Sequence, residues 1–227
     1  MDIKDKVALV TGSSIGIGRE VVLKLAKAGA KVVITCHETV KEAEAVMKEC
    51  EKSTECLFVK SDMRKDKDIK DLVKKVIKKF GRLDILVNNA GIVRWKAFDK
   101  HTFEDFQNLT DTNLSGVMKL TLESLPHLKK AKDAIIINLA SVAGKEPYGG
   151  LAAYCATKWG LRGFTQSLAV ELPPHIRIHS INPGLTKTRM TDFEGDSVED
   201  VAQVIMDTIK GKIEKKPGAD IDIHDYI

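Results

Sequence analysis

The sequence predicts an α/β fold with one doubly wound, parallel sheet of about seven strands and helices on both faces. Three observations predict it: short runs rich in β-branched residues recur along the chain, amphipathic patterns separate these runs, and a glycine-rich turn follows the first run. Such alternation is typical of right-handed crossovers within one sheet. The ligand crevice of this fold opens at the carboxyl ends of the strands, so functional residues are expected directly after strands.

The expected strands are short and nearly continuous in apolar residues, as strands covered on both faces should be. They are Val7–Val10, Lys31–Thr35, Cys56–Val59, Ile85–Val87, Ala134–Leu139, Ile176–Ser180 and an alternating edge strand, Asp220–Ile223. Between strands, apolar residues such as Ile69, Leu72 and Val76 recur at helical spacing and make one apolar helix face. No linker-like segment divides the sequence, so residues 1–227 are expected to form a single domain.

Composition excludes several classes of function. The chain has 227 residues, and its 36 basic and 32 acidic residues are interleaved, so no basic block is present to bind a nucleic acid. No apolar run approaches the ~20 residues of a membrane span, and the first residues lack the pattern of a signal peptide. We therefore expect a cytoplasmic protein with neither a membrane nor a nucleic acid as partner.

The four cysteines predict neither a disulfide framework nor a metal centre. Cys36, Cys50, Cys56 and Cys155 form no C-x-x-C pair and have no histidine nearby at zinc-ligand spacing. A chain of this length can also bury a sufficient core without disulfides. We interpret these residues as reduced thiols and expect no metal.

The glycine turn lies between the first strand and the first helical pattern. Gly12 suits a tight turn, Gly16 lets the backbone approach a pyrophosphate, and Gly18 permits close packing of the helix. A simple packing turn is the alternative, but the strand–turn–helix context favours a dinucleotide-binding Rossmann fold. The expected contacts are Gly12, Ser13, Ser14, Ile15, Gly16, Ile17 and Gly18.

The end of the second strand bears on the choice between NAD and NADP. An acidic residue there would bind the ribose 2′-hydroxyl of NAD and repel the additional phosphate of NADP, but Cys36 and His37 stand at this point. His37 can face a 2′-phosphate, with Arg19 or Lys41 nearby, or it can be a solvated loop residue. We favour NADP as the cofactor, and Glu38 leaves NAD as the alternative.

A tyrosine and a lysine at helical spacing form the candidate catalytic pair. Tyr154 and Lys158 are four residues apart, which places them on one face of a helix. A nearby cation is expected to lower the pKa of the tyrosine and make it a proton donor and acceptor. Ser141 follows the fifth strand, where its hydroxyl can hold a carbonyl or alcohol oxygen. Such a pair alone is more often a surface pair; together with Ser141 and the glycine turn it indicates catalysis.

From Lys6 to about Thr188 the chain resembles the single-domain branch of the short-chain dehydrogenase/reductase (SDR) family, and it is similar to reductases of the 3-oxoacyl-thioester type. The glycine spacing and the Tyr154/Lys158 pair carry this resemblance, together with the motifs Asn88-Asn89-Ala90-Gly91 and P-G-x-x-x-T from Pro183. It implies cofactor contacts by Asp62, Met63, Asn89, Ala90, Gly91, Tyr154, Lys158, Pro183, Gly184, Thr186 and Thr188, besides those of the glycine turn and Cys36 and His37. Each motif alone also fits a structural cap or turn.

The expected function is an NAD(P)-dependent oxidoreductase that transfers a hydride between the cofactor and a carbonyl or alcohol. Tyr154 would be the general acid and base, Ser141 would bind the reacting oxygen, and Lys158 would lower the tyrosine pKa and bind the nicotinamide ribose. The resemblance implies that Asn113 holds a water on the proton relay. The alternative is a dinucleotide-binding redox sensor without turnover, which would not need this complete catalytic set.

The determinants of the substrate are harder to read. A short lid is expected near 185–197, and the loops 92–95 and 143–150 complete the expected substrate wall. Arg94, Lys145 and Arg189 can attract an anionic substrate or be ordinary surface charges. The chain lacks the glycine-rich segment that often follows the last strand in the family. The resemblance implies a homodimer or homotetramer.

Overall fold

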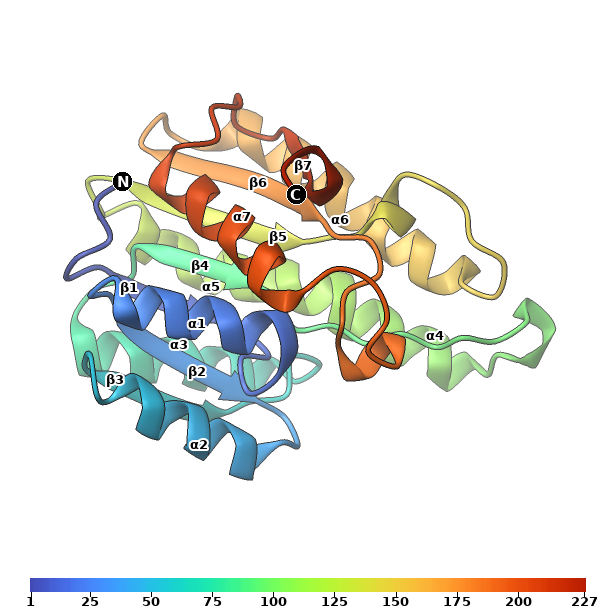
Figure 1. Ribbon diagram of the computed structural model, residues 1–227, viewed down its shortest axis with the longest axis horizontal. Coiled ribbons are helices and arrows are strands. Elements are labelled where there is room, and N and C mark those ends of the chain that lie inside the picture. Colours follow the sequence, from blue (N-terminus) through green and yellow to red (C-terminus); the bar gives the residue numbers. More distant parts are fainter.

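The computed structural model describes residues 1–227 and confirms the predicted fold class (Figure 1). All seven strands are parallel and follow the order β3-β2-β1-β4-β5-β6-β7. The strands are β1 (Val7–Val10), β2 (Lys31–Cys36), β3 (Cys56–Lys60), β4 (Ile85–Asn88), β5 (Ala134–Leu139), β6 (Ile176–Asn182) and β7 (Asp220–Asp222). The α-helices are α1 (Gly16–Lys27), α2 (Val40–Cys50), α3 (Asp66–Phe80), α4 (Phe103–Thr110), α5 (Gly116–Leu128), α6 (Ala152–Glu171) and α7 (Val198–Lys210).

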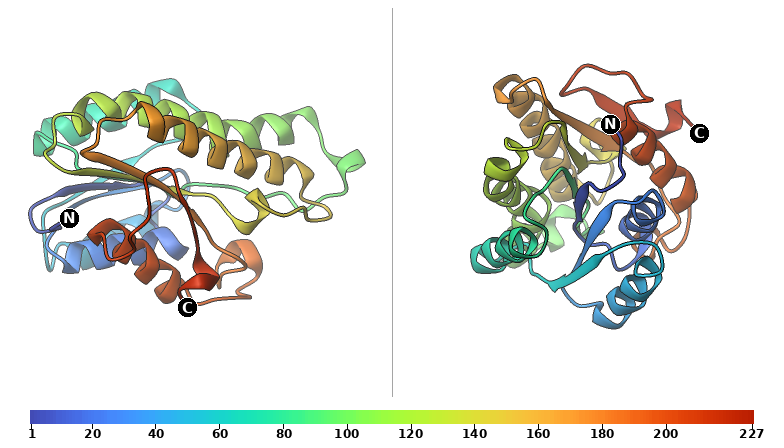
Figure 2. Two further views of the ribbon diagram at one scale, coloured as in Figure 1. Left: turned by 90° about the horizontal axis from the view of Figure 1, so that it is seen from above. Right: turned by 90° about the vertical axis from the view of Figure 1, so that its left-hand side faces the viewer.

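Helices cover both faces of the sheet, as Figure 2 shows from above and from one side. Helices α1, α2 and α7 pack on one face, and α3, α5 and α6 on the other. Strand β1 supplies both layers, because Ala8 and Val10 belong to the first core and Val7 and Leu9 to the second. Burial on both faces explains why the strands are continuously apolar in sequence.

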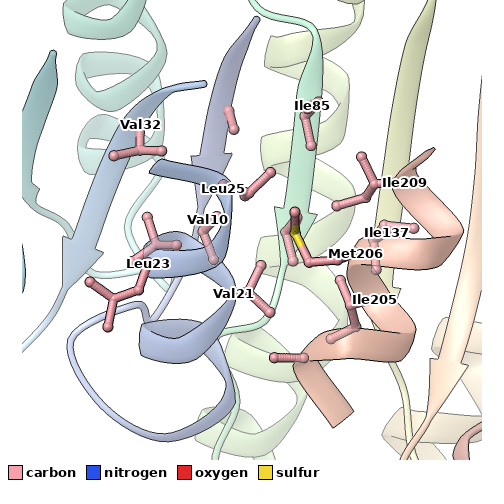
Figure 3. Packing of buried hydrophobic residues seen from close by; sticks show 14 of the residues in the cluster. Val10, Val21, Leu23, Leu25, Val32, Ile85, Ile137, Ile205, Met206 and Ile209 are labelled. Atoms are coloured by element: carbon pink, nitrogen blue, oxygen red, sulfur yellow. The ribbon is translucent and has the colours of Figure 1, made fainter. Parts of the chain in front are cut away.

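Helices α1 and α7 lie side by side over the first face, although they come from opposite ends of the chain (Figure 3). Val21 and Leu25 of α1 and Ile205 of α7 pack in the same buried cluster as Val10 and Ile137 of the sheet. This packing fixes the start of α1, and with it the glycine turn, relative to the centre of the sheet.

The predicted strand limits differ from the observed ones by at most two residues. Strand β6 extends to Asn182, and β7 ends at Asp222 because Ile223 begins a short 3₁₀ turn, Ile223–Asp225. The connection order reverses at β1, which lies between β2 and β4, and this reversal creates the ligand crevice.

The helix pattern after β4 contains an irregularity. Residues Asp111–Ser115 form a π-helical segment between α4 and α5, and such segments occur frequently at functional sites.

None of the helices combines the length and the hydrophobicity that crossing a membrane requires.

Candidate active site

The glycine turn has a backbone conformation that requires glycine. Gly12 has a φ of +61°, and a Cβ built on it would lie 3.0 Å from the Cα of Ala90. Gly18 is equally confined, since its Cβ would lie 2.4 Å from Asn89 Nδ2 and 2.6 Å from the Gly12 carbonyl oxygen. The turn therefore packs directly against the segment that follows β4.

Uncharged side chains hold this turn in place. The side-chain nitrogen of Asn89, Nδ2, donates to the carbonyl oxygens of Thr11 (2.8 Å) and Gly12 (3.0 Å). The Gly12 N–H donates to Thr35 Oγ1 at 3.2 Å, and Thr11 Oγ1 accepts from the backbone of Asn89 at 2.9 Å. The sequence analysis did not identify these two threonines, although both stand at the ends of strands, where functional residues were expected.

Ser13 belongs to the same scaffold and not to the cleft. It is fully buried; its hydroxyl donates to Val10 O at 2.8 Å and accepts from Thr35 N at 3.0 Å. The side chain thus joins the ends of β1 and β2.

The start of α1 suits an anionic group. Ile15 is the N-cap and provides no side-chain hydrogen bond, and the first turn contains no acidic residue. The first N–H groups of a helix have no partner within the helix and carry a partial positive charge. Together with the glycine turn, this terminus fits the pyrophosphate of a dinucleotide.

A continuous cleft of about 1160 Å³ runs along the carboxyl ends of the strands, large enough for a cofactor and a small substrate. It is lined by most predicted residues: Gly12, Ser14, Ile15, Gly16, Ile17, Cys36, His37, Asp62, Met63, Asn89, Ala90, Gly91, Ser141, Tyr154, Lys158, Pro183, Gly184, Thr186 and Thr188. Three predicted residues, Ser13, Gly18 and Asn113, lie behind this lining.

Arg64 and His37 flank a buried carboxylate at the β2–β3 end of the cleft. Arg64 binds Asp62 with two nitrogens, at 2.9 and 2.8 Å, and donates to Asn108 Oδ1 at 2.8 Å. His37 Nε2 lies 3.4 Å from Asp62 Oδ2. Hydrogen bonding by Arg64 outweighs burial and lowers the pKa of Asp62 to about 2. Sequence analysis missed Arg64, although its place two residues after Asp62 permits this local pair.

The candidate catalytic side chains come from β5 and α6. Ser141 follows β5, and its hydroxyl accepts from Ala143 N at 3.1 Å. Lys158 is buried; its ammonium donates to the Leu139 carbonyl oxygen at 2.7 Å and lies 5.6 Å from the centre of the Tyr154 ring. Burial lowers the pKa of Lys158 to about 8.

The pKa of Tyr154 differs from the sequence-based expectation. Burial raises it to about 12, and the neighbouring Ser141 hydroxyl opposes this only in part. The expected lowering of this pKa is therefore not found, because desolvation of the buried phenol is the dominant effect; the Lys158 ammonium hydrogen-bonds to the Leu139 backbone. Tyr154 is thus protonated at neutral pH.

Asn113 is fully buried in the π-helical segment, and its amide pairs with a backbone. Its Oδ1 accepts from Ile92 N and its Nδ2 donates to Ile92 O, both at 2.8 Å. A further contact reaches Thr157 Oγ1 at 3.3 Å. The side chain therefore positions the segment after β4, so a water on a proton relay would have to bind other atoms of this segment.

The segment 185–197 is a short loop whose residues line the cleft. Leu185 O accepts from Asp196 N at 2.9 Å, and Lys187 N donates to Asp196 O at 2.8 Å, so the two ends of the loop are joined. Thr188 caps the turn Arg189–Thr191 by accepting from Met190 N at 3.2 Å. Pro183, Gly184, Thr186 and Thr188 thereby lie along one side of the cleft.

The three candidate anion-attracting cations have acidic partners. Lys145 pairs with Asp222, Arg189 with Glu42 at 3.3 Å and Arg94 with Asp105 at 3.9 Å. The mouth is instead lined by partly exposed apolar side chains: Trp95, Leu185, Met190 and Phe193. His224, from the C-terminal turn, also lines the cleft, and no sequence signal pointed to it.

The sequence profile of the family described as short chain dehydrogenase matches residues 6–199. The 3-oxoacyl-acyl-carrier-protein reductase FabG of Staphylococcus aureus (strain Mu50) is 36% identical over 197 residues, covering 86% of this chain and 80% of the relative. A 3-oxoacyl-acyl-carrier-protein reductase of Synechocystis is 38% identical over 189 residues, covering 82% and 76%.

Solved structures show the same relationship. A short chain dehydrogenase from Burkholderia cenocepacia in complex with NADP has a TM-score of 0.91 and 29% identity, covering 98% of this chain and 97% of that one. A dehydrogenase/reductase from Sinorhizobium meliloti has a TM-score of 0.89 and 28% identity, covering 97% and 95%. These relatives are oxidoreductases, which sets aside the non-catalytic alternative. The chain belongs to the short-chain dehydrogenase/reductase family of NAD(P)-dependent oxidoreductases.

Proposed function

We propose that this protein is an NADPH-dependent carbonyl reductase in which Tyr154 supplies the proton. The observation that supports this most is the convergence of three polar groups at one part of the cleft: the hydroxyls of Ser141 and Tyr154, with the Lys158 ammonium over the tyrosine ring.

The roles of the three side chains follow from their surroundings. A nicotinamide cofactor supplies the hydride when bound. Tyr154 holds its proton at neutral pH, since its pKa is about 12, and donates it to the carbonyl oxygen. Ser141 donates a hydrogen bond to the same oxygen as negative charge develops. Lys158 has a pKa of about 8, so at neutral pH its charge opposes the cost of forming a phenolate.

The cofactor is held mainly by backbone and by neutral side chains. We assign the pyrophosphate to the turn from Gly12 to Gly18, with Ser13 and Gly18 supporting it from behind. The adenosine end is assigned to Cys36, His37, Asp62, Met63, Asn89, Ala90 and Gly91, and the nicotinamide end to Tyr154, Lys158, Pro183, Gly184, Thr186 and Thr188. Asn113 positions the segment after β4 through Ile92.

NADP is favoured over NAD for two reasons. The Burkholderia neighbour was solved with NADP, and Arg19, His37 and Arg64 line the adenosine end here, with Arg19 paired to Glu49 and Arg64 to Asp62. The carboxylates of Glu38, Glu49 and Asp62 oppose the two arginine charges, which makes the ratio of kcat/KM values with NADPH and NADH the decisive quantity.

The substrate proposed is a small carbonyl compound of the 3-oxoacyl-thioester type. Two features support it: the similarity to the 3-oxoacyl reductases and the apolar mouth formed with the lid 185–197.

We further propose a homodimer or homotetramer, supported by the exposed Leu122 and Trp159 on α5 and α6. The four free cysteines support a reducing cytoplasm.

The test is NADPH consumption, followed by absorbance, with 3-oxoacyl thioesters, simple ketones, sugars and steroids. Turnover of at least one carbonyl class is expected, with a higher kcat/KM for NADPH than for NADH. The Ser141→Ala variant serves as the active-site control. Absence of turnover with every class would contradict the proposal, and a preference for NADH would contradict only its cofactor part.

A further inference from the structure

The edge strand β7 carries two aspartates, and each holds a cation from an element next to the active site. Asp220 binds Arg162 of α6 through two nitrogens, with Nε at 2.9 Å from Oδ1. Asp222 binds Lys145, which follows the turn after Ser141, and accepts from Asn182 Nδ2 at 2.8 Å. The C-terminal strand is therefore tied to both segments that carry the catalytic hydroxyls.

Arg162 connects these two segments directly. It lies one helical turn beyond Lys158 and two turns beyond Tyr154 on α6. Its Nη1 donates to the carbonyl oxygen of Gly144, the last residue of the turn Val142–Gly144.

That turn holds the serine hydroxyl. Gly144 N donates to Ser141 O at 2.9 Å, and Ala143 N donates to Ser141 Oγ at 3.1 Å. One guanidinium thus bonds to β7 on one side and to the serine turn on the other, from the helix that presents Tyr154.

The pair between Arg162 and Asp220 is largely withdrawn from solvent. The side chains are 15% and 18% exposed, and Ser180 donates a hydrogen bond to Asp220. Burial would raise the pKa of Asp220, but Arg162 and Ser180 outweigh it and lower the pKa to about 2. Both partners are therefore charged at neutral pH. The pair of Lys145 and Asp222 is a second tie, with its lysine 36% exposed.

We propose that Asp220 and Arg162 are positioning residues, which set the place of the Ser141 hydroxyl relative to Tyr154 through the turn Val142–Gly144. The inference rests on the proposed function, since it concerns the alignment of its two hydroxyls. A misplacement of about 1 Å can cost roughly 100-fold in rate. Strand β7 thus influences catalysis through a series of contacts, none of which reaches the substrate.

The first measurement does not need turnover. The protein has only three tyrosines, so ¹³C labelling of the phenol carbon and the Tyr154→Phe variant identify the Tyr154 signal. We expect Asp220→Asn and Arg162→Met to move this signal in the same direction as Ser141→Ala. The control, Lys212→Met, removes an ion pair with Asp207 at the end of α7 and should leave the signal unchanged.

The second measurement is kinetic. Arg162→Met and Asp220→Asn are each expected to lower kcat roughly 10- to 100-fold, with an unchanged Kd for NADPH and a double variant no worse than the poorer single one. Arg162→Lys should recover part of the rate. Ser141→Ala should cost less in the Arg162→Met background than in the native protein, because the serine is already misplaced there.

Two results would overturn the proposal. One is a Tyr154 signal that stays at its native position in both Asp220→Asn and Arg162→Met, whether or not Ser141→Ala moves it. The other is a lower melting temperature with a native kcat, or a loss of kcat that adds fully to the loss caused by Ser141→Ala. If Arg162→Met fails to fold, the isosteric Asp220→Asn decides by the same readouts. If the native protein turns over no carbonyl, the proposed function fails, and the tyrosine signal still decides the positioning.

Discussion

The two halves of the cleft are held together by different interactions. On the β1–β2 side, the glycine turn is fixed by neutral hydrogen bonds from Thr11, Thr35 and Asn89 at the ends of adjacent strands. On the β5–β7 side, the segments around the catalytic hydroxyls are joined by the ion pair of Arg162 and Asp220. The glycine turn depends on backbone shape, whereas the catalytic side depends on charged side chains from distant parts of the sequence. Changes in the first should affect cofactor binding, and changes in the second should affect the chemical step.

The largest expected effect concerns the chemical step alone. Tyr154→Phe removes the proton donor, and kcat for carbonyl reduction should fall by about 10²- to 10⁴-fold. The Kd for NADPH, measured by fluorescence titration, should stay near the native value. Tyr226→Phe at the C-terminal turn is the matched control. Native kcat in Tyr154→Phe would contradict the assignment of the proton donor.

Gly18→Ala should do the opposite and damage the cofactor half. The added methyl group would lie 2.4 Å from Asn89 Nδ2 and 2.6 Å from Gly12 O, so the turn must shift. We expect a loss of about 1–3 kcal/mol in the free energy of unfolding, and an NADPH Kd at least roughly tenfold weaker.

Gly163→Ala on α6 is the control for that change, because its Cβ would meet no atom within 4 Å. Alanine in a helix interior should stabilise the protein by roughly 0.5–1 kcal/mol. Denaturant unfolding and titration with NADPH measure both quantities. Equal behaviour of the two alanine variants would show that the close approach at Gly18 does not shape the cofactor site.

The pH dependence should report on Lys158. Burial lowers its pKa to about 8, so its charge is present below that pH and is lost as the pH rises through it. The kcat/KM for carbonyl reduction should therefore decline above about pH 8, by up to about tenfold per pH unit. Tyr154 stays protonated until about pH 12, so its own pKa does not set this decline.

Lys158→Arg provides the check, because a guanidinium keeps its charge throughout this range. The decline should vanish or move to higher pH in this variant, whatever rate it retains. A native pH profile in Lys158→Arg would assign the decline to another group.

Arg64→Met should have the smallest effect and bear on cofactor choice. It removes the cation that pairs with the buried Asp62 and leaves the carboxylate facing the adenosine end of the cleft. NADPH carries the additional phosphate, so its Kd should weaken roughly fivefold more than that of NADH, about 1 kcal/mol. Lys52→Met, at an exposed lysine just after α2, is the control. An unchanged ratio of the two dissociation constants would assign cofactor choice to His37 or Arg19.

The same contrast explains what the sequence could predict. The strands, the glycine turn and the pair Tyr154/Lys158 were readable, because they depend on local periodicity, on glycine geometry and on helical spacing. The pairing of Arg162 with Asp220 was not, since 58 positions separate them and many charged pairs were equally available.

Burial also altered the roles of residues that were correctly found. The sequence placed a cation near Tyr154, yet the desolvation of the phenol decides its pKa and raises it. Asn113 was singled out by resemblance, but only the fold shows its amide paired with Ile92. Composition and spacing contain no information on which hydrogen bond a buried group makes.

Hydride transfer from the nicotinamide to a carbonyl carbon is the step on which all of these roles depend. It is tested most directly with NADPH deuterated at the nicotinamide position that donates the hydride, using the best carbonyl substrate from the panel. Mass spectrometry of the product alcohol should find one deuterium on the former carbonyl carbon. A product without deuterium, formed while NADPH is consumed, would contradict the account.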